Sequence, residues 1–466
     1  MEDYHLELGA QWIHGEKNKV FKICEENSLL TEEHSGEGEG LYLRENGETI
    51  DDSLVREIDD VIKNILENCE NYYYKVSSMG FDENYHNSIG NELMTKFNEY
   101  LNEHCAEDSV KVKEIKRDLL DWHTRFQLID NSCSDLHNLS AKAWGLFKFC
   151  GGKDYVNFKK GYSSLIDVLI NSLPENSIVY ESPVQRIDWV SEDDKTKRSN
   201  ITPYNDRQYN NNNNNNVKIT CKNGLTFYAQ HVIVTCSLGY LKLNYKTMFY
   251  PPLPNYLSEA IELLDFGVLD KIFLIYEKKW WDSGVKGFQL VWSQSVESEG
   301  ERGKHWGKYV TGFDVIIKDK PVLLGWIGGE GAKIVERLTE EEIGRDATDI
   351  LRKFCNRTDV PQPKKVIRST WWSNEYVRGG YSHITVKCDE PKINGSNLAQ
   401  PVYTTVVAGA AAAAAVSKSG TTHKKPTILL AGECTHKNYF STVHGAYESG
   451  QNQARVILDY QKQINH

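Results

Sequence analysis

The stretch from Thr427 to Leu458 limits what this chain can fold into more than any other. It reads as a short apolar strand at Thr427–Ala431, a polar loop, and then a helix that begins at about His444. A strand, a loop and a helix in this order form the repeating unit of α/β domains. We therefore expect an α/β fold.

The helix in this stretch has one bare face. Ala446, Gly450 and Ala454 stand four residues apart, so that side of the helix carries almost no side chain. Such a face admits a flat group, either another backbone or a cofactor ring, and the free N–H groups of the helix start suit an anion or a carbonyl-rich ring. The alternative is an ordinary crossover in which small residues only ease packing, and the spacing alone favours that plainer interpretation.

The charge balance excludes some partners. The chain of 466 residues has 54 basic and 65 acidic residues and a net charge of −11. This argues against nucleic acid as the main partner and tolerates a cationic ligand. The hydrophobic fraction of 40% indicates a globular protein with sizeable cores.

The ten cysteines include no CxxC pair. We therefore predict no metal site and no disulfide framework, and expect reduced thiols of the cytoplasmic kind. The chain contains no run of about 18 apolar residues, so we predict no transmembrane helix. The first residues lack the shape of a signal peptide.

The first third of the chain is mostly helical by pattern. Residues 6–13 look like a buried strand followed by a turn, and residues 17–150 carry apolar positions at helical spacing. This part contains no catalytic motif.

A β-rich part follows. It covers 177–190 and 217–236, with Asn223-Gly224 as a hairpin turn. Residues 191–216, which end in a run of asparagines, and residues 408–425, which contain a run of alanines, are predicted to be low-complexity insertions.

Beyond a proline-rich crossing at 251–254, residues 271–281 and 321–329 look like strands of a second sheet. Residues 338–355 predict a helix with Thr339 as its N-cap. The alternation of these blocks suggests two interleaved domains.

A few side chains could carry chemistry. Lys271 opens an apolar strand, so it lies either at an exposed strand end or in a dry pocket where its pKa falls. His14 follows a buried strand and is more often a core residue than a catalyst in such a place. Trp371, Tyr376 and Tyr381 are either core aromatics or walls of a slot for a cation. From the residues alone, the chain is a two-domain α/β protein and a cofactor enzyme.

Six motifs give the chain a resemblance to a known family. They are LELGAQWIHGE at 6–16, HVIVTCSLGYLK at 231–242, YPPLP at 250–254, FGVLDKIFL at 266–274, W-x4-Y-x2-G-x-Y-S from Trp371, and AGECTH-x4-STVHGA at 431–446. In order and spacing they resemble the flavin-dependent polyamine oxidases, within the wider flavin amine oxidase family. The last motif is the most specific.

The resemblance implies a Rossmann-like FAD-binding domain interleaved with an α+β substrate domain on a six-stranded mixed sheet. By residues, it implies 1–16, 156–250 and 425–466 for FAD binding, and 17–155 and 251–424 for the substrate. FAD would be non-covalent, because no cysteine stands where monoamine oxidases tether their flavin. The reaction implied is hydride transfer from the carbon beside a secondary amine, followed by imine hydrolysis and by reduction of O2 to H2O2.

The resemblance also assigns residues. Lys271 matches the lysine that holds a water near the flavin, and His14 the active-site histidine of animal polyamine oxidases. Tyr381 and Thr442 match positions beside the substrate amine. The cofactor contacts it implies are Trp12, Val184, Trp371, Gly432, Glu433, Ser441, Thr442, Val443 and Ala446.

The chain departs from the family at its start, where a strand–GxGxxG–helix unit precedes the motif at Leu6. No GxGxxG occurs in the chain, so we expect that this sequence is N-terminally incomplete. We further expect a monomer. A histone demethylase is disfavoured because no long helical insertion is present. The rival hypothesis is a non-catalytic remnant that binds polyamine or a partner without FAD.

Overall fold

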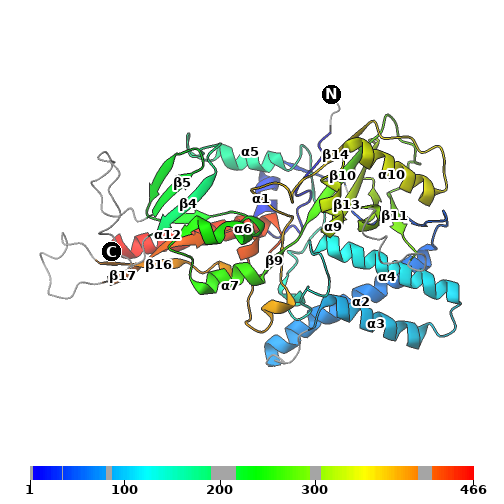
Figure 1. The fold of residues 1–466 in the computed structure, drawn as a ribbon, viewed down its shortest axis with the longest axis horizontal. Coiled ribbons are helices and arrows are strands. Elements are labelled where there is room, and N and C mark those ends of the chain that lie inside the picture. Colours follow the sequence, from blue (N-terminus) through cyan, green and yellow to red (C-terminus); the bar gives the residue numbers. More distant parts are fainter. Residues whose placement is uncertain are drawn as a thin grey trace, which may run out of the picture.

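The computed structural model describes residues 4–33, 35–79, 87–189, 217–293, 306–407 and 422–465. The molecule is elongated, with two lobes along its long axis (Figure 1). We call the lobe that contains α12 the first lobe, and the lobe that contains α10 the second lobe. Among the described helices, none is both long enough and apolar enough to cross a membrane.

The second lobe is built on a six-stranded sheet. Its neighbouring strands are, in order, β14 (Lys365–Arg368), β10 (Leu269–Ile275), β13 (Val322–Gly328), β12 (Val310–Asp314), β11 (Gly287–Val291) and β2 (Leu41–Arg44). β11 pairs with β2 in parallel, and the other pairs are antiparallel. The predicted mixed sheet is confirmed.

Helices cover both faces of this sheet, and every residue of its interior strand β10 is buried. These helices are α2 (Asp52–Met79), α3 (Ile89–His104), α4 (Val110–Asp130), α9 (Gly329–Val335) and α10 (Glu340–Cys355). Ile272 packs in the core with α9 and α10, whereas Phe273 packs in a separate cluster with the end of α4. Because side chains alternate along a strand, Asp270 points with Ile272 and Lys271 points with Phe273.

α10 begins as predicted. The Thr339 side chain accepts a hydrogen bond from the Glu342 backbone N–H, and the Glu342 carboxylate accepts one from the Thr339 backbone N–H. This capping box satisfies two N–H groups that would otherwise lack partners at the helix start.

The first lobe holds two smaller sheets and most of the remaining helices. One sheet contains β16 (Val402–Val407), β17 (Thr422–Leu430) and β7 (Val232–Val234), with β17 parallel to β7. The other contains β6 (Thr226–Ala229), β5 (Val217–Cys221), β4 (Val184–Trp189) and β8 (Phe249–Tyr250). The helices are α1 (Lys19–Glu26), α5 (Ser163–Asn171), α6 (Leu238–Met248), α7 (Asn255–Leu263), α11 (Gly395–Leu398) and α12 (Val443–Asn465).

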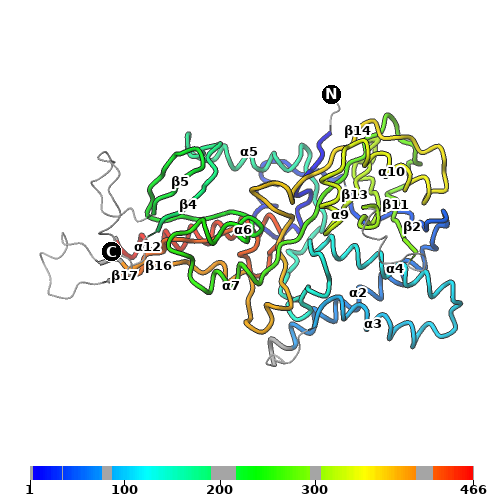
Figure 2. Tube along the Cα trace, in the orientation of Figure 1, coloured from blue at the N-terminus to red at the C-terminus, as the bar shows by residue number. Residues whose placement is uncertain are grey.

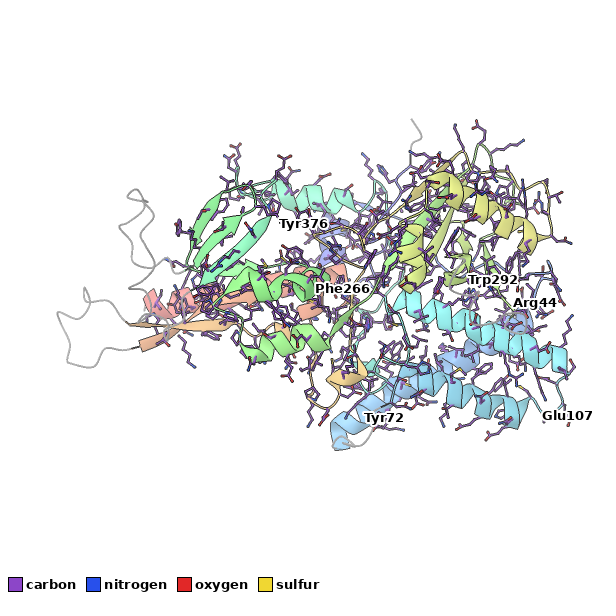
Figure 3. All side chains as sticks on the ribbon, viewed as in Figure 1. Arg44, Tyr72, Glu107, Phe266, Trp292 and Tyr376 are labelled. Atoms are coloured by element: carbon purple, nitrogen blue, oxygen red, sulfur yellow. The ribbon has the colours of Figure 1, made fainter. Side chains whose placement is uncertain are left out.

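The chain passes between the lobes repeatedly (Figure 2). Two short strand pairs lie on these passages: β1 (Leu30–Thr31) with β3 (Asn157–Phe158), and β9 (Asp265–Phe266) with β15 (Ser382–His383). Figure 3 shows Phe266 near the junction, with Tyr376 on the side of the first lobe and Trp292 in the second. An interleaved arrangement of this kind places residues from distant parts of the chain at the junction.

Three predicted features differ from the structure. Residues 6–12 form no strand, and only Ile13 makes a bridge, to Val156. The predicted β run at 177–190 becomes a strand only from Val184, because no described strand pairs with 177–183 and Ile178 and Val179 are exposed.

The predicted insertion at 408–425 ends earlier than expected. Residues 422–425 belong to β17, because they pair with the end of β16. The core of the first lobe also includes Leu257 of α7 and Val402 of β16. The insertion at 191–216 and residues 408–421 lie outside the described residues.

The cysteines are all unpaired. Eight of the ten are buried, and Cys236 and Cys355 are half-buried.

Candidate active site

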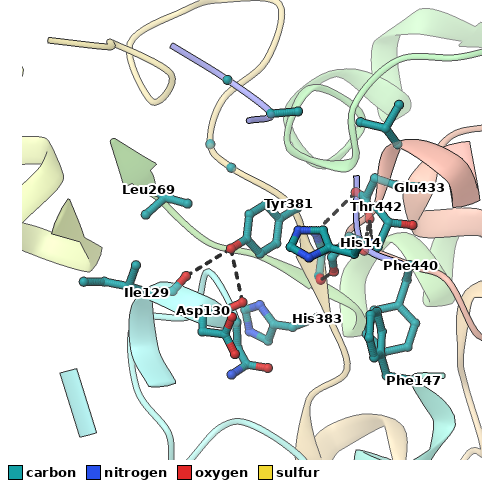
Figure 4. Close-up of a pocket in the computed structure, with 18 of the residues that line it drawn as sticks. His14, Ile129, Asp130, Phe147, Leu269, Tyr381, His383, Glu433, Phe440 and Thr442 are labelled. Atoms are coloured by element: carbon teal, nitrogen blue, oxygen red, sulfur yellow. Dashed lines mark hydrogen bonds between the residues drawn. The ribbon is translucent and has the colours of Figure 1, made fainter. Parts of the chain in front are cut away.

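One cavity lies where the two lobes meet. It has a volume of about 530 Å³, and its wall comes from the N-terminal segment, the end of α4, β10 and β13, and residues 371–384 and 433–446 (Figure 4). Residues that are hundreds of positions apart in sequence therefore face one another.

Most of the predicted site residues line this cavity. They are Trp12, His14, Lys271, Trp371, Tyr381, Glu433, Ser441, Thr442, Val443 and Ala446. Val184 does not, because it starts β4 and packs on the core of the first lobe. Gly432 also lies off the wall; its φ of 142° is one that favours glycine.

Lys271 is buried, with 2% of its surface exposed. Its Nζ donates to the carbonyl oxygens of Glu7 and Gly9, both at 2.8 Å, and to Oε1 of Gln11 at 3.0 Å. The same nitrogen lies 4.3 Å from the centre of the Trp326 ring. The N-terminal segment is thus held by the lysine rather than by a strand ladder.

Burial lowers the pKa of Lys271 to about 7, and the charges of Glu7 and Glu37 oppose this shift. Of the two interpretations that the sequence left open, the dry pocket is the one the structure supports. A lysine with this pKa exists in both protonation states near neutral pH, as an acid–base group requires.

His14 faces the cavity beside two aromatic rings. Its ring centre lies 6.4 Å from that of Trp12 and 5.8 Å from that of Tyr155, both in edge-to-face geometry. Burial lowers the pKa of His14, while a backbone hydrogen bond and the charge of Asp154 raise it. The imidazole is therefore neutral at neutral pH and has a free lone pair for an N–H donor.

Tyr381 is anchored to the end of α4. Its hydroxyl donates towards the carbonyl oxygens of Ile129 and Asp130, each at 3.1 Å (Figure 4). Burial raises the pKa of Tyr381 well above its ordinary value, so the side chain stays a neutral phenol.

Thr442 closes the first turn of α12. Its Oγ1 donates to the carbonyl oxygen of Tyr439 at 2.7 Å and accepts from the Gly445 backbone N–H at 3.0 Å. A side chain at Gly445 would place Cβ only 1.8 Å from that same carbonyl oxygen. The glycine therefore lets the loop and the helix start pack together.

Glu433 joins the two segments that carry Tyr381 and Thr442. Its carboxylate accepts hydrogen bonds from Ser382 Oγ at 2.6 Å, Ser382 N at 3.2 Å and Ser441 N at 2.7 Å. Burial raises the pKa of Glu433, and these hydrogen bonds lower it. Ser441 has a φ of 64°, so the carboxylate also stabilises a backbone conformation that serine rarely adopts.

The bare face of α12 is open in the structure. Ala446 lines the cavity, and an added Cβ at Gly450 would meet nothing within 4 Å. Ala454 is exposed at the far end of that face.

Sequence reasoning missed three carboxyl groups in the cavity wall: Glu70, and the pair formed by Glu37 and Asp130. Burial raises the pKa of Asp130 to about 6, although the side chain is accessible from the cavity. Burial also raises the pKa of Glu37, and the charges of Asp130 and Asp314 raise it further. Neither carries a spacing signal: Glu37 stands in a polar loop, and Asp130 is the last residue of an ordinary helix.

The wall fits one end of a flavin. A flat ring can approach Ala446 and Gly450 without meeting a side chain. The indole of Trp326 is 8% exposed at the wall, and its Nε1 has no hydrogen-bond partner among the described residues, so it can donate to a ring acceptor. Glu433 and Ser441 present polar groups beside the start of α12.

Comparison with known proteins agrees with this geometry. The family model "Flavin containing amine oxidoreductase" matches residues 1–458. The human protein "Peroxisomal N(1)-acetyl-spermine/spermidine oxidase" is 28% identical over 97% of this chain and 85% of its own length. "Probable polyamine oxidase 5" of Arabidopsis thaliana is 26% identical over 98% of this chain and 89% of its own length.

Among solved structures, cyclohexylamine oxidase from Brevibacterium oxydans superposes with a TM-score of 0.63. It is 15% identical, over 98% of this chain and 88% of its own, which shows a shared fold. The match to the family model over nearly the whole chain is decisive: the chain belongs to the flavin-containing amine oxidoreductases and is an amine oxidase that uses FAD.

Proposed function

We propose that this amine oxidase acts on polyamines, at a carbon beside a secondary amine. The products would be an imine, which water hydrolyses to an amine and an aldehyde, and H2O2 formed from O2. The observation that carries the proposal is the pair of carboxyl groups, Glu37 and Asp130, in the wall of the same cavity as Lys271 and the bare face of α12.

A polyamine brings at least two amino groups into the site. One must be neutral at the reacting carbon, and the others stay protonated in water. Glu37 and Asp130 can bind a protonated nitrogen, which in turn favours their charged forms and lowers their raised pKa values. A monoamine has no second nitrogen for these carboxyl groups to bind.

The residues near the reacting end supply polar contacts. Bound FAD would supply the oxidising group, as the family implies. The neutral His14 can accept a hydrogen bond from a substrate N–H. The phenol ring of Tyr381 can orient the carbon chain of the substrate. The human relative named as an N(1)-acetyl-spermine/spermidine oxidase and the Arabidopsis relative named as a probable polyamine oxidase support this substrate class.

The test is to purify the chain and record its visible spectrum. An assay coupled to H2O2 follows, with spermine, N1-acetylspermine, spermidine and a simple monoamine. We expect flavin bands and turnover of at least one polyamine well above the monoamine. A flavin-free protein that still binds spermine would favour the non-catalytic alternative, and faster turnover of the monoamine would contradict the proposed substrate class.

Asp130→Asn should raise the KM for the preferred polyamine by roughly tenfold, because a charged hydrogen bond to the distal nitrogen is lost. The KM for a monoamine should stay unchanged. In the unsubstituted enzyme the KM should also rise as the pH falls through about 6, where Asp130 becomes protonated.

The matched control is Asp135→Asn. Asp135 follows Asp130 closely in sequence but is exposed and bonds to His137. An equal rise of KM in both variants, or a pH dependence of KM that persists in Asp130→Asn, would show that Asp130 does not bind the substrate.

A further inference from the structure

Asp270 is a fully buried carboxyl group outside the predicted site. It precedes Lys271 on β10 and points to the opposite face of the sheet, with 0% of its surface exposed. A carboxyl group in such a place requires partners that offset the loss of water.

The contacts of Asp270 connect it to two chain segments whose residues line the cavity. Its Oδ1 accepts from Ser369 Oγ at 2.6 Å and from the Trp371 backbone N–H at 3.1 Å. Ser369 Oγ in turn accepts from the Lys271 backbone N–H at 2.8 Å. One carboxyl group therefore fixes the main chain of two residues whose side chains line the cavity.

A second carboxyl group holds the next two residues. Glu336, at the C-terminal end of α9, accepts from the Trp372 N–H at 2.7 Å and from the Ser373 N–H at 2.9 Å. Three consecutive backbone N–H groups, beginning at Trp371, thus point at two neighbouring carboxyl groups.

The two carboxyl groups also interact with each other. The Oδ2 atom of Asp270 receives no hydrogen bond from any donor among the described residues. Burial raises the pKa of Asp270, and the neighbouring Glu336 carboxyl group raises it further, against the lowering effect of Ser369 and Trp371. Two carboxyl groups can form a hydrogen bond only when one of them holds a proton.

We propose that Asp270 and Glu336 share one proton and together position Trp371 and the backbone of Lys271 at the cavity wall. Asp270 donates this proton to Glu336 and keeps its other oxygen for Ser369 and Trp371. The consequence for turnover rests on the proposed function, whereas the placement of Trp371 does not.

The decisive pair of variants is Asp270→Asn and Asp270→Ala. Asparagine is neutral, donates to Glu336 through its amide nitrogen and accepts from Ser369 and Trp371 through its oxygen, so it reproduces the protonated acid. Alanine removes every one of these contacts. A shared proton therefore predicts that asparagine preserves the wall and alanine does not.

The first measurement uses flavin-free protein labelled with fluorotryptophan. The chain has 11 tryptophans, and Trp371→Phe identifies the fluorine resonance of Trp371. We expect Asp270→Ala to shift or broaden this resonance and Asp270→Asn to leave it in place. Asp314→Asn is the control, because Asp314 is a buried acid whose pKa burial raises to about 7 but which bonds to Gln289 and Gly38 instead.

The second measurement is the infrared carbonyl band of a protonated carboxylic acid at neutral pH, which Asp270→Asn should remove. Retention of the full band in Asp270→Asn, or a Trp371 shift as large in Asp270→Asn as in Asp270→Ala, would overturn the shared proton. An unmoved resonance in Asp270→Ala would overturn the positioning role. If Asp270→Ala does not fold, the infrared band and the Trp371 resonance in Asp270→Asn still test the shared proton.

In enzyme that retains flavin, Asp270→Ala should lower kcat by about tenfold or more, since small displacements of site residues are costly. Asp270→Asn should restore kcat to within about threefold of the unsubstituted enzyme. A wild-type protein without amine oxidase activity would contradict the proposed function and leave the resonance and infrared results intact.

Discussion

Lys271→Met lowers the turnover of the amine substrate by roughly 100-fold or more, the scale expected when a positioned acid–base group is removed. Methionine keeps much of the length and apolar character of the lysine stem, so the wall retains its shape. What disappears is the nitrogen that bonds to Glu7, Gly9 and Gln11 and that titrates near neutral pH. Stopped-flow measurement of flavin reduction and reoxidation would show which half of the cycle needs it.

Lys320→Met is the matched control. Lys320 also lies near an aromatic ring, with its Nζ 5.7 Å from the centre of the Tyr4 ring, but it does not line the cavity. Its loss should leave turnover unchanged. Kinetics of Lys271→Met that match the unsubstituted enzyme would refute the role of Lys271.

The same lysine should set part of the pH dependence of stability. Its pKa falls from an ordinary value of 10.5 to about 7 on burial, so between these values the unfolded chain binds more protons than the folded one. The free energy of unfolding therefore rises with pH across this interval, by up to about 1.4 kcal/mol per pH unit from this group. Urea unfolding at a series of pH values should show that this slope is reduced in Lys271→Met. An equal slope in both proteins would contradict the lowered pKa of Lys271.

Ala446→Phe abolishes flavin retention. The new ring would enter the cavity from the bare face of α12, at the place where the wall leaves room for a flat group. The ratio of bound flavin to purified protein should fall below about a tenth of the unsubstituted value.

Ala454→Phe is the control on the same helix. It stands two helical turns further on, and its side chain is exposed. Circular dichroism should show both variants folded. Normal flavin content in Ala446→Phe would show that the flavin ring binds elsewhere. Flavin loss in both variants would indicate damage to the helix.

Local signals made part of the fold predictable. The N-cap at Thr339 and the helix that begins at Val443 depend on residues close in sequence, and both predictions hold within a residue or so. Strand pairing is a long-range property, so 177–183 and residues 6–12 were assigned as strands that the structure does not form. An apolar run becomes a strand only where another strand is available to pair with it.

The same distinction applies to the site. Motifs shared with the family located Lys271 and Glu433, but only the packing of the N-terminal segment and of Trp326 on Lys271 shows that the lysine is buried. Glu37 and Asp130 come together because the end of α4 meets an N-terminal loop at the junction. No spacing between them in sequence could reveal this.

The buried, unpaired cysteines give this protein a built-in probe of how its cores open. Burial raises the pKa of Cys69 and of Cys133 to about 12, so very little reactive thiolate exists at neutral pH while the protein is closed. Cys150 is 3.3 Å from His444 at the junction of the lobes. A thiol-reactive dye added to the native enzyme should therefore react slowly, and fast only after unfolding, so that alkylation rates report unfolding without an engineered label.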